Sequence, residues 1–179
     1  MLEWNVVVSV YAEGYRRAIR LLQRFGRVAP TDYYNVLVME VDDTSAFIEA
    51  LAGIVAETPG ILNDISRVAP CESCFDYESA QEFDSKARDV ALSWMPELAH
   101  SAFHVRMHRR GFKERLSSQD EERFLDSVLL AALDEAGTPG RITFDDPDAI
   151  VSVETVGQRA GMSFWRREDL ERYPFLRLD

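Results

Sequence analysis

The alternation of strand-like and helix-like patterns over residues 1–70 limits the fold more than any other feature of the sequence. Runs rich in β-branched residues, typical of strands, cover residues 4–10, 34–41 and 61–69. Between them, apolar residues recur at the three- and four-residue spacing of one helix face over residues 15–25 and 47–55. This pattern predicts helices packed on a sheet.

A short strand is also expected at residues 27–29, joined by a turn to the strand that follows it. The resulting order, strand-helix-strand-strand-helix-strand, is that of a ferredoxin-like domain. We expect this domain to occupy residues 1–70, with its second helix capped by Asp43, Thr44 or Ser45.

The remainder of the chain, residues 71–179, predicts a second α/β domain packed against the first, so the expected fold class is α/β (α+β). Apolar spacing indicates a helix over residues 78–98. Phe103, Val105 and Met107 then alternate with polar residues, as in a strand with one buried face. The later elements expected are a helix opened by a capping box of Ser118 and Glu121, strands at 141–144, 150–156 and 162–165, and a packed tail anchored by Tyr173, Phe175 and Leu178.

Basic and acidic residues are segregated along the chain. The formal net charge of −11 opposes binding to a phosphate backbone. However, three blocks at residues 14–27, 106–115 and 159–177 hold 15 of the 20 basic residues and only 4 of the 31 acidic ones. Nearly all the basic residues are Arg, whose planar fork grips phosphate and stacks on bases. A basic face on an acidic body is therefore compatible with a nucleic-acid partner, although solvated helix faces explain such blocks equally well.

Cys71 and Cys74 have the Cys-x-x-Cys spacing of metal and redox sites. A structural zinc site needs about four ligands, and the residues considered for completing one are His100, His104 and His108. We favour two loop cysteines without a chemical function. A small metal-dependent enzyme that uses Cys71 and Cys74 is kept as an alternative.

Motifs that bind the common cofactors are absent from the sequence. There is no Gly-rich phosphate loop, dinucleotide-binding Gly pattern, nucleophile elbow or His-Glu-x-x-His helix. The acidic runs at 120–122 and 145–148 are interpreted as structural, the second because it lacks the spacing of a calcium loop. We therefore expect no cofactor, no metal and no catalytic residue.

Features of targeting segments and membrane spans are also missing. No apolar run approaches the roughly 20 residues of a membrane span, and the opening residues lack a basic leader. The small number of cysteines fits a reducing compartment. We expect a cytoplasmic protein without a membrane partner.

The second half of the chain resembles a THUMP domain. The resemblance is carried by residues 103–111 (Phe-His-Val-Arg-Met-His-Arg-Arg-Gly), the capped helix from Ser118, the turn and strand of 143–154, and the Gly-Met-Ser-Phe of 161–164. The tail at 173–178 is similar to that of the stand-alone THUMP adaptors of tRNA cytidine acetylation, which also carry a ferredoxin-like unit first. The resemblance implies a THUMP domain at 71–179 that binds tRNA near its acceptor end.

A THUMP chain without a catalytic domain implies a non-catalytic protein that presents tRNA, and not DNA, to a separate tRNA-modifying enzyme. Such proteins read RNA shape and phosphates more than sequence. The residues expected to contact RNA are Arg16, Arg20, Arg24, Arg106, His108, Arg109, Arg110, Lys113, Arg115, Arg159, Arg166 and Arg167. A protein-interaction or ligand-sensing module is the other alternative, and it is favoured if the basic blocks lie on separate faces.

Overall fold

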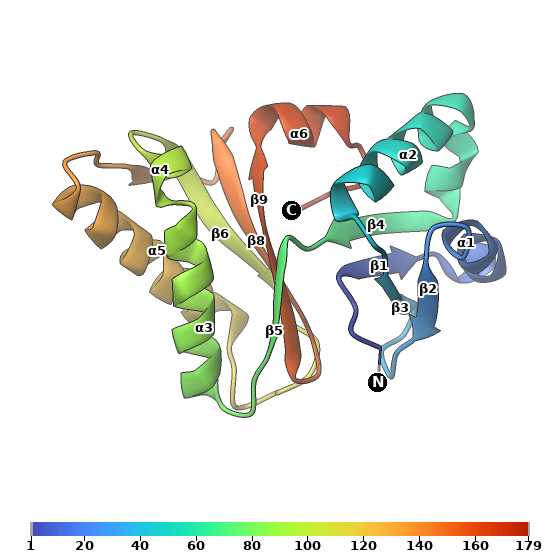
Figure 1. The fold of residues 1–179 in the computed structure, drawn as a ribbon, viewed down its shortest axis with the longest axis horizontal. Helices are drawn as coiled ribbons and strands as arrows, with labels where there is room; N and C mark the ends of the chain where they lie inside the picture. The colour runs from blue at the N-terminus through green and yellow to red at the C-terminus, as the bar shows by residue number, and fades with distance from the viewer. Residues whose placement is uncertain (1, 179) are drawn as a thin grey trace. The chain divides into compact units, whose positions relative to one another are not determined.

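A computed structural model describes residues 2–178 and divides the chain into two compact units. The first contains the chain up to Glu72 together with Leu170–Arg177, and the second contains Ser73–Asp169 and Leu178 (Figure 1). Each unit combines one sheet with helices, so the predicted α+β class is confirmed. None of the helices within residues 2–178 has the length and apolarity that crossing a membrane requires.

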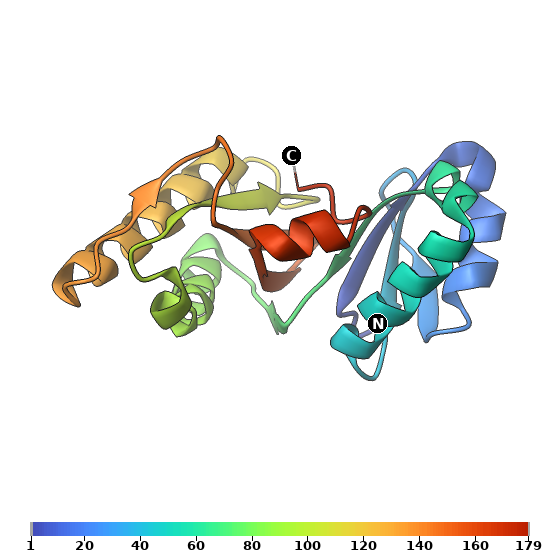
Figure 2. The same cartoon turned by 90° about the horizontal axis from the view of Figure 1, so that it is seen from above.

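The sheet of the first unit has four antiparallel strands in the order β2-β3-β1-β4. Its elements are β1 (Val6–Val10), η1 (Ala12–Gly14), α1 (Tyr15–Leu22), β2 (Arg27–Pro30), β3 (Val36–Glu40), α2 (Thr44–Glu57), η2 (Pro59–Asn63) and β4 (Ile65–Pro70). This is the predicted order of strands and helices, and Figure 2 shows α1 and α2 on the same side of the sheet. The carboxylate of Asp43 caps α2 by accepting the Ala46 amide at 3.0 Å.

The residues after α6 (Arg167–Arg172) return to the first unit and lie beside β4, an outer strand of its sheet. The Val68 amide donates a hydrogen bond to the Phe175 carbonyl at 2.8 Å. Tyr173, Phe175 and Leu178 are buried. The packed tail predicted from these apolar residues is therefore confirmed.

The sheet of the second unit is mixed and has the order β5-β9-β8-β6-β7. Its elements are β5 (Ser73–Asp76), α3 (Ala80–Ser93), α4 (Met95–Leu98), β6 (Ala102–His108), α5 (Ser118–Glu135), β7 (Arg141–Ile142), β8 (Ala149–Val156) and β9 (Arg159–Arg166). Strand β6, next to the edge strand β7, is parallel to both of its neighbours, whereas β5 and β8 pair with β9 in antiparallel fashion.

One face of β6 supplies the core of the second unit. Phe103, Val105 and Met107 are buried, as their alternation predicts. They belong to one apolar cluster with residues of α3 and α5, among them Phe83, Ala87, Ala91, Leu125, Leu129 and Leu133. The opposite side chains of β6, including Arg106 and His108, are thereby directed away from this core.

The prediction that both cysteines lie in a loop is correct for Cys71 but wrong for Cys74. Residues 73–76 form β5, which pairs with the whole first half of β9 from Ser73↔Met162 to Asp76↔Arg159. A strand of four residues at a sheet edge shows too little alternation to be recognised, since its pairing partner lies more than 80 residues away in the sequence.

Several element boundaries also differ from those predicted. The helix expected at 78–98 is divided at Trp94, which ends α3 and precedes Pro96 in α4. α5 is capped by Ser117, whose hydroxyl accepts the Asp120 amide at 3.3 Å, so the predicted capping box of Ser118 and Glu121 is wrong by one residue.

Candidate nucleic-acid interface

The end of β6 and the segment that follows it gather six of the predicted RNA contacts. Arg106 and His108 lie on the strand face opposite the apolar core. The basic loop, residues 109–116, then carries Arg109, Arg110, Lys113 and Arg115 before α5 begins. The position of β6 in the sheet therefore determines where these basic side chains lie.

The basic loop has an unusual backbone. Gly111, Phe112 and Glu114 all have positive φ angles of 91°, 56° and 71°. Left-handed conformations cost about 1–2 kcal/mol for residues with a side chain, so other contacts must hold them. The Phe112 ring packs edge-on against Tyr77 with 5.3 Å between centroids. The Phe112 carbonyl accepts the Leu116 amide at 3.1 Å, which closes the loop.

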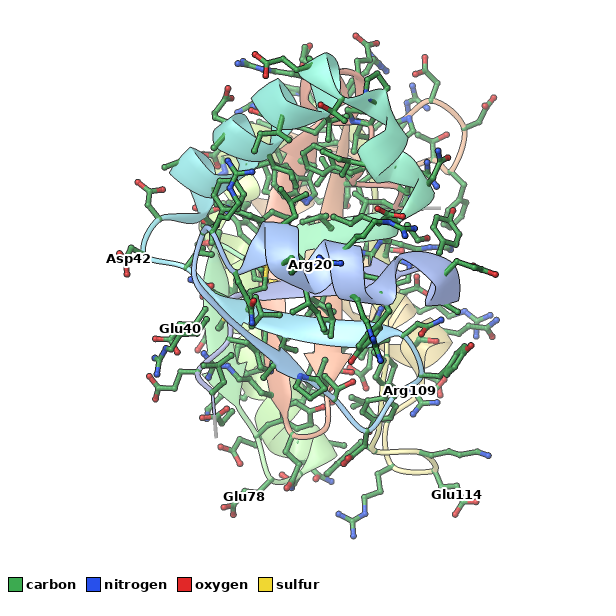
Figure 3. The ribbon with its side chains drawn as sticks, turned by 90° about the vertical axis from the view of Figure 1, so that its right-hand side faces the viewer. Arg20, Glu40, Asp42, Glu78, Arg109 and Glu114 are labelled. Carbon is green, nitrogen blue, oxygen red and sulfur yellow. The ribbon has the colours of Figure 1, made fainter. Side chains whose placement is uncertain are left out.

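Four cations of this region have no carboxylate partner among residues 2–178: Arg106, Arg109, Lys113 and Arg115. Arg106 Nε donates to the Leu178 carbonyl at 3.1 Å, and Arg109 donates to the Gly111 carbonyl. The Arg115 guanidinium lies over the Phe112 ring, 5.0 Å from its centroid. Their charges are therefore available to a phosphate backbone. Figure 3 shows the loop with Arg109 and Glu114 labelled.

Arg110, by contrast, is held by a buried carboxylate. Its guanidinium lies 2.7 Å from Glu154 Oε2, and the two side chains are 14% and 1% exposed. The other Glu154 oxygen lies 3.4 Å from His108 Nδ1. The Arg110 backbone amide donates to Thr155 Oγ1 at 3.0 Å. Arg110 thus fastens the basic loop to β8, and Glu154 compensates its charge.

The remaining predicted contacts of the second unit lie at or next to the two ends of β9: Arg159, Arg166 and Arg167. Arg159 pairs with Asp76 at 3.2 Å, close to the end of β6 that carries His108. Arg166 is opposite Ala149, which is itself opposite Phe103, so it lies at the other end of the sheet. Arg166 follows Arg159 by seven positions along the strand, which corresponds to roughly 23 Å.

Arg167 follows Arg166 and is also paired, with Asp146 at 3.0 Å and Asp148 at 3.1 Å. The Arg166 guanidinium lies 5.2 Å from the centroid of the Phe164 ring. The structure therefore does not bring Arg166 and Arg167 into the group formed by Arg106 and the basic loop.

The other predicted contacts belong to the first unit. Arg16 and Arg20 lie one turn apart on the exposed side of α1. α1 ends at Leu22, so Arg24 leaves the helical stripe, and its guanidinium lies 6.0 Å from the Phe25 ring centroid. The helix expected over residues 15–25 is thus shorter than predicted, and Arg24 lies beyond its end.

Acidic residues of α5 bind the backbone of β6. Asp126 Oδ1 accepts the Val105 amide at 3.0 Å, and Glu122 Oε2 accepts the Met107 amide at 3.2 Å. Burial raises the pKa of Asp126 to about 7. Burial, assisted by the neighbouring carboxyl of Asp84, raises the pKa of Glu121 to about 8. These acids therefore support the fold, as interpreted for the run at 120–122.

No group of three or more His, Cys, Asp or Glu residues within 2–178 is arranged to hold a metal ion. Cys71 is buried at the end of β4, and Cys74 is half-buried in β5. Among the described residues, Cys71, Cys74 and a histidine therefore do not form one group of ligands.

Sequence reasoning missed Glu154 as a residue of this region. The available signal was its place after the apolar run of β8, because a charged residue in a buried strand requires a partner. It also missed the exposed Tyr34, which no spacing or motif marked.

No protein-family model and no curated protein matches this sequence. Solved structures do share its fold. PH1313 from Pyrococcus horikoshii matches 90% of this chain and 54% of its own length, with 11% identity and a TM-score of 0.62. TrmN from Thermus thermophilus matches 89% of this chain and 44% of its own, with 16% identity and a TM-score of 0.59.

A 4-thiouridine synthetase, solved in complex with RNA and bound ATP, also matches this chain over 92% of its length. The match covers 42% of the synthetase, with 15% identity and a TM-score of 0.55. This chain spans about half the length, or less, of these three proteins. What they share with it is the two-sheet α+β fold.

Proposed function

We propose that this chain is a THUMP-type RNA-binding protein that presents tRNA to a separate modifying enzyme and catalyses no reaction itself. The observation that carries the proposal is a set of four cations, at the end of β6 and in the basic loop, that have no carboxylate partner among the described residues: Arg106, Arg109, Lys113 and Arg115. Its fold is that of part of TrmN and of a 4-thiouridine synthetase crystallised with RNA.

The geometry of the basic loop supports binding of an RNA backbone. Phe112 anchors the loop to Tyr77, so the exposed side chains of Lys113 and Arg115 extend from a fixed base. Preorganised cations lose less entropy when they bind phosphates, and their effect is local despite the negative net charge. The basic loop is not a helix that could read base edges in a groove. Recognition of the RNA would therefore depend on its shape and its phosphates.

In this proposal, residues 1–70 act as the ferredoxin-like domain and 71–179 as the THUMP domain, in the cytoplasm. The proposal assigns catalysis to a separate partner enzyme, and the part of the compared structures that this fold matches is 42–54% of their length.

The proposal is tested by titrating the protein with bulk tRNA, duplex DNA and tRNA lacking its 3′ end at several salt concentrations. The variant Arg109→Glu with Lys113→Glu should weaken tRNA binding more than about tenfold and lower its salt dependence, because phosphate contacts release counterions. The matched control is Arg123→Glu, since Arg123 is exposed on α5 with only a 4.0 Å contact to Asp120. Equal losses in both variants would contradict an interface at the basic loop.

One observation favours a protein-interaction module as a second candidate. Arg166 and Arg167 lie at the opposite end of the sheet from the basic loop, so the basic residues do not form one group. Absence of tRNA binding at low salt would make this second function the better explanation.

A further inference from the structure

A cavity of about 570 Å³ lies in the first unit, between the start of α1 and the loop that joins β2 to β3. Its lining includes Arg16 and Arg20 on the helix side and Tyr34 and Asn35 on the loop side. Cavities that hold small molecules usually have volumes of roughly 300–1,000 Å³. The space is therefore sufficient for one nucleotide.

Two cations of the cavity are available to a ligand. Within residues 2–178 no carboxylate forms an ion pair with Arg16 or Arg20, and Arg20 Nε contacts only the Arg16 carbonyl at 3.5 Å. Figure 3 shows Arg20 on the outer side of α1. Glu13 also lines the cavity and reduces its positive charge, but leaves two guanidinium groups one helical turn apart.

A third arginine of the lining, Arg17, is already occupied. Its Nε and a terminal nitrogen bind the two Asp64 oxygens at 3.0 and 2.8 Å. This pair requires the glycine at position 14, because a Cβ there would lie 2.4 Å from the Asp64 Cα. Arg17 therefore fixes the start of α1, and ligand binding is left to Arg16 and Arg20.

The loop side of the cavity exposes an aromatic ring. Tyr34 is 84% exposed, the largest exposure among the large hydrophobic residues of 2–178. The loop beneath it is ordered, since the Thr31 hydroxyl donates to the Val36 carbonyl at 2.8 Å and accepts the Tyr33 amide at 3.1 Å. The Asn35 carbonyl accepts the Val10 amide at 3.0 Å. A rigid loop thus holds a ring in water, where it can stack on a base.

We propose that this cavity binds one unpaired nucleotide, with its base stacked on Tyr34 and its phosphate between Arg16 and Arg20. A planar ring joined to a phosphate matches a tyrosine face beside two guanidinium forks. The inference rests on the proposed function where the nucleotide belongs to a bound RNA. A free nucleoside monophosphate has the same chemistry, so the test must separate the two sources.

The test measures binding of hexacytidylate and of CMP to the full chain by calorimetry. Tyr34→Ala, and the pair Arg16→Ala with Arg20→Ala, should each weaken hexacytidylate binding at least about fivefold, as loss of one stacked base or phosphate contact implies. Tyr34→Phe retains the ring face and should bind like wild type. Arg27→Ala is the matched control, because the Arg27 side chain is exposed in the same unit but does not line the cavity.

The outcomes separate this inference from the proposed function. Equal binding by Tyr34→Ala and Tyr34→Phe, or no binding of hexacytidylate and CMP by wild type, overturns the cavity site even if tRNA binding depends on the basic loop. Loss of hexacytidylate binding in Tyr34→Ala supports the site even if charge reversal at Arg109 and Lys113 leaves tRNA binding unchanged. CMP binding as tight as that of hexacytidylate assigns the cavity to a free nucleotide, whereas preference for the oligomer assigns it to RNA.

Discussion

Asp126 Oδ1 accepts a hydrogen bond from the Val105 amide at 3.0 Å, so a helix side chain occupies the place where a neighbouring strand would supply a carbonyl. β7 pairs with β6 only through Ala102 and Phe103, which leaves the later amides of β6 without a strand partner on that side. Glu122 serves the Met107 amide in the same way at 3.2 Å. Carboxylates of α5 thereby complete an edge that would otherwise have buried, unpaired donors.

We expect Asp126→Ala to lower the free energy of unfolding by about 1–3 kcal/mol, because the Val105 amide would lose its acceptor in a buried position. Urea denaturation measures this change. Asp134→Ala, at an exposed position of the same helix, should change stability by less than about 0.5 kcal/mol. Similar effects of both substitutions would show that the hydrogen bond to Val105 contributes little.

We expect the free energy of unfolding to decrease as the pH rises from about 5 to about 8. Burial raises the pKa of Glu121 from 4.5 to about 8, with Asp84 adding to the shift. Over this range the folded protein keeps a proton on Glu121 that the unfolded chain has released, so rising pH favours unfolding. Glu121→Gln cannot ionise, and its stability relative to wild type should therefore be greater at pH 8 than at pH 5.

Carboxyl groups whose pKa is lowered change their protonation below this pH range. The pKa of Asp148 is lowered, chiefly by the hydrogen bond from the Ala102 amide. Its contribution to stability is present above about pH 4 and is lost as the pH falls through its folded pKa. Between pH 5 and 8 it is constant, so parallel stability curves for wild type and Glu121→Gln would contradict the role given to Glu121.

The ion pair of Arg110 and Glu154 predicts strong coupling between two substitutions. Glu154→Leu alone leaves a nearly buried guanidinium uncompensated and should destabilise the protein by about 3 kcal/mol. Adding Arg110→Met should recover a large part of this loss, which a double-mutant cycle in urea measures. Additive effects would mean that the pair does not interact. If the double variant is stable yet binds tRNA tenfold more weakly, Arg110 contacts RNA directly.

Gly111→Val should affect the basic loop more than the core. Gly111 has a φ of 91°, which a β-branched residue adopts only with strain, so we expect a loss of about 1–2 kcal/mol in stability. Displacement of Lys113 and Arg115 should weaken tRNA binding severalfold at temperatures where the variant is folded. Gly137→Val is the control, because Gly137 also has a positive φ (74°) but lies in the turn after α5. This variant should show the same backbone strain without a change in RNA binding.

Local patterns predicted the elements of this chain better than their contacts. The strands and helices of the first unit follow from spacing because each signal lies within about ten residues, as with Phe47 and Val55 on the buried face of α2. β5 and α6 are too short to give such a signal, and both were missed. The shift of the α5 cap to Ser117 reflects two adjacent serines of equal capping ability.

The candidate site depended on contacts that sequence cannot supply. Whether Arg110 is available to RNA is decided by Glu154, which lies 44 positions later in the chain. The position of Arg166 follows from the antiparallel direction of β9, which places it beside Ala149 and away from His108. The role of these basic residues in RNA binding stays a prediction, and their grouping follows only from the topology of the sheet.

The hydrogen bond from Val68 to Phe175 has a consequence for synthesis on the ribosome. Every strand of the first sheet is translated early, yet the segment around Phe175, which pairs with β4, is made only after residues 73–169 of the second unit. Until then an unpaired strand edge stays exposed in the nascent chain, and such edges invite association with other chains. A chaperone that shields β4 during elongation would therefore raise the yield of native protein, and the first 72 residues expressed alone should aggregate.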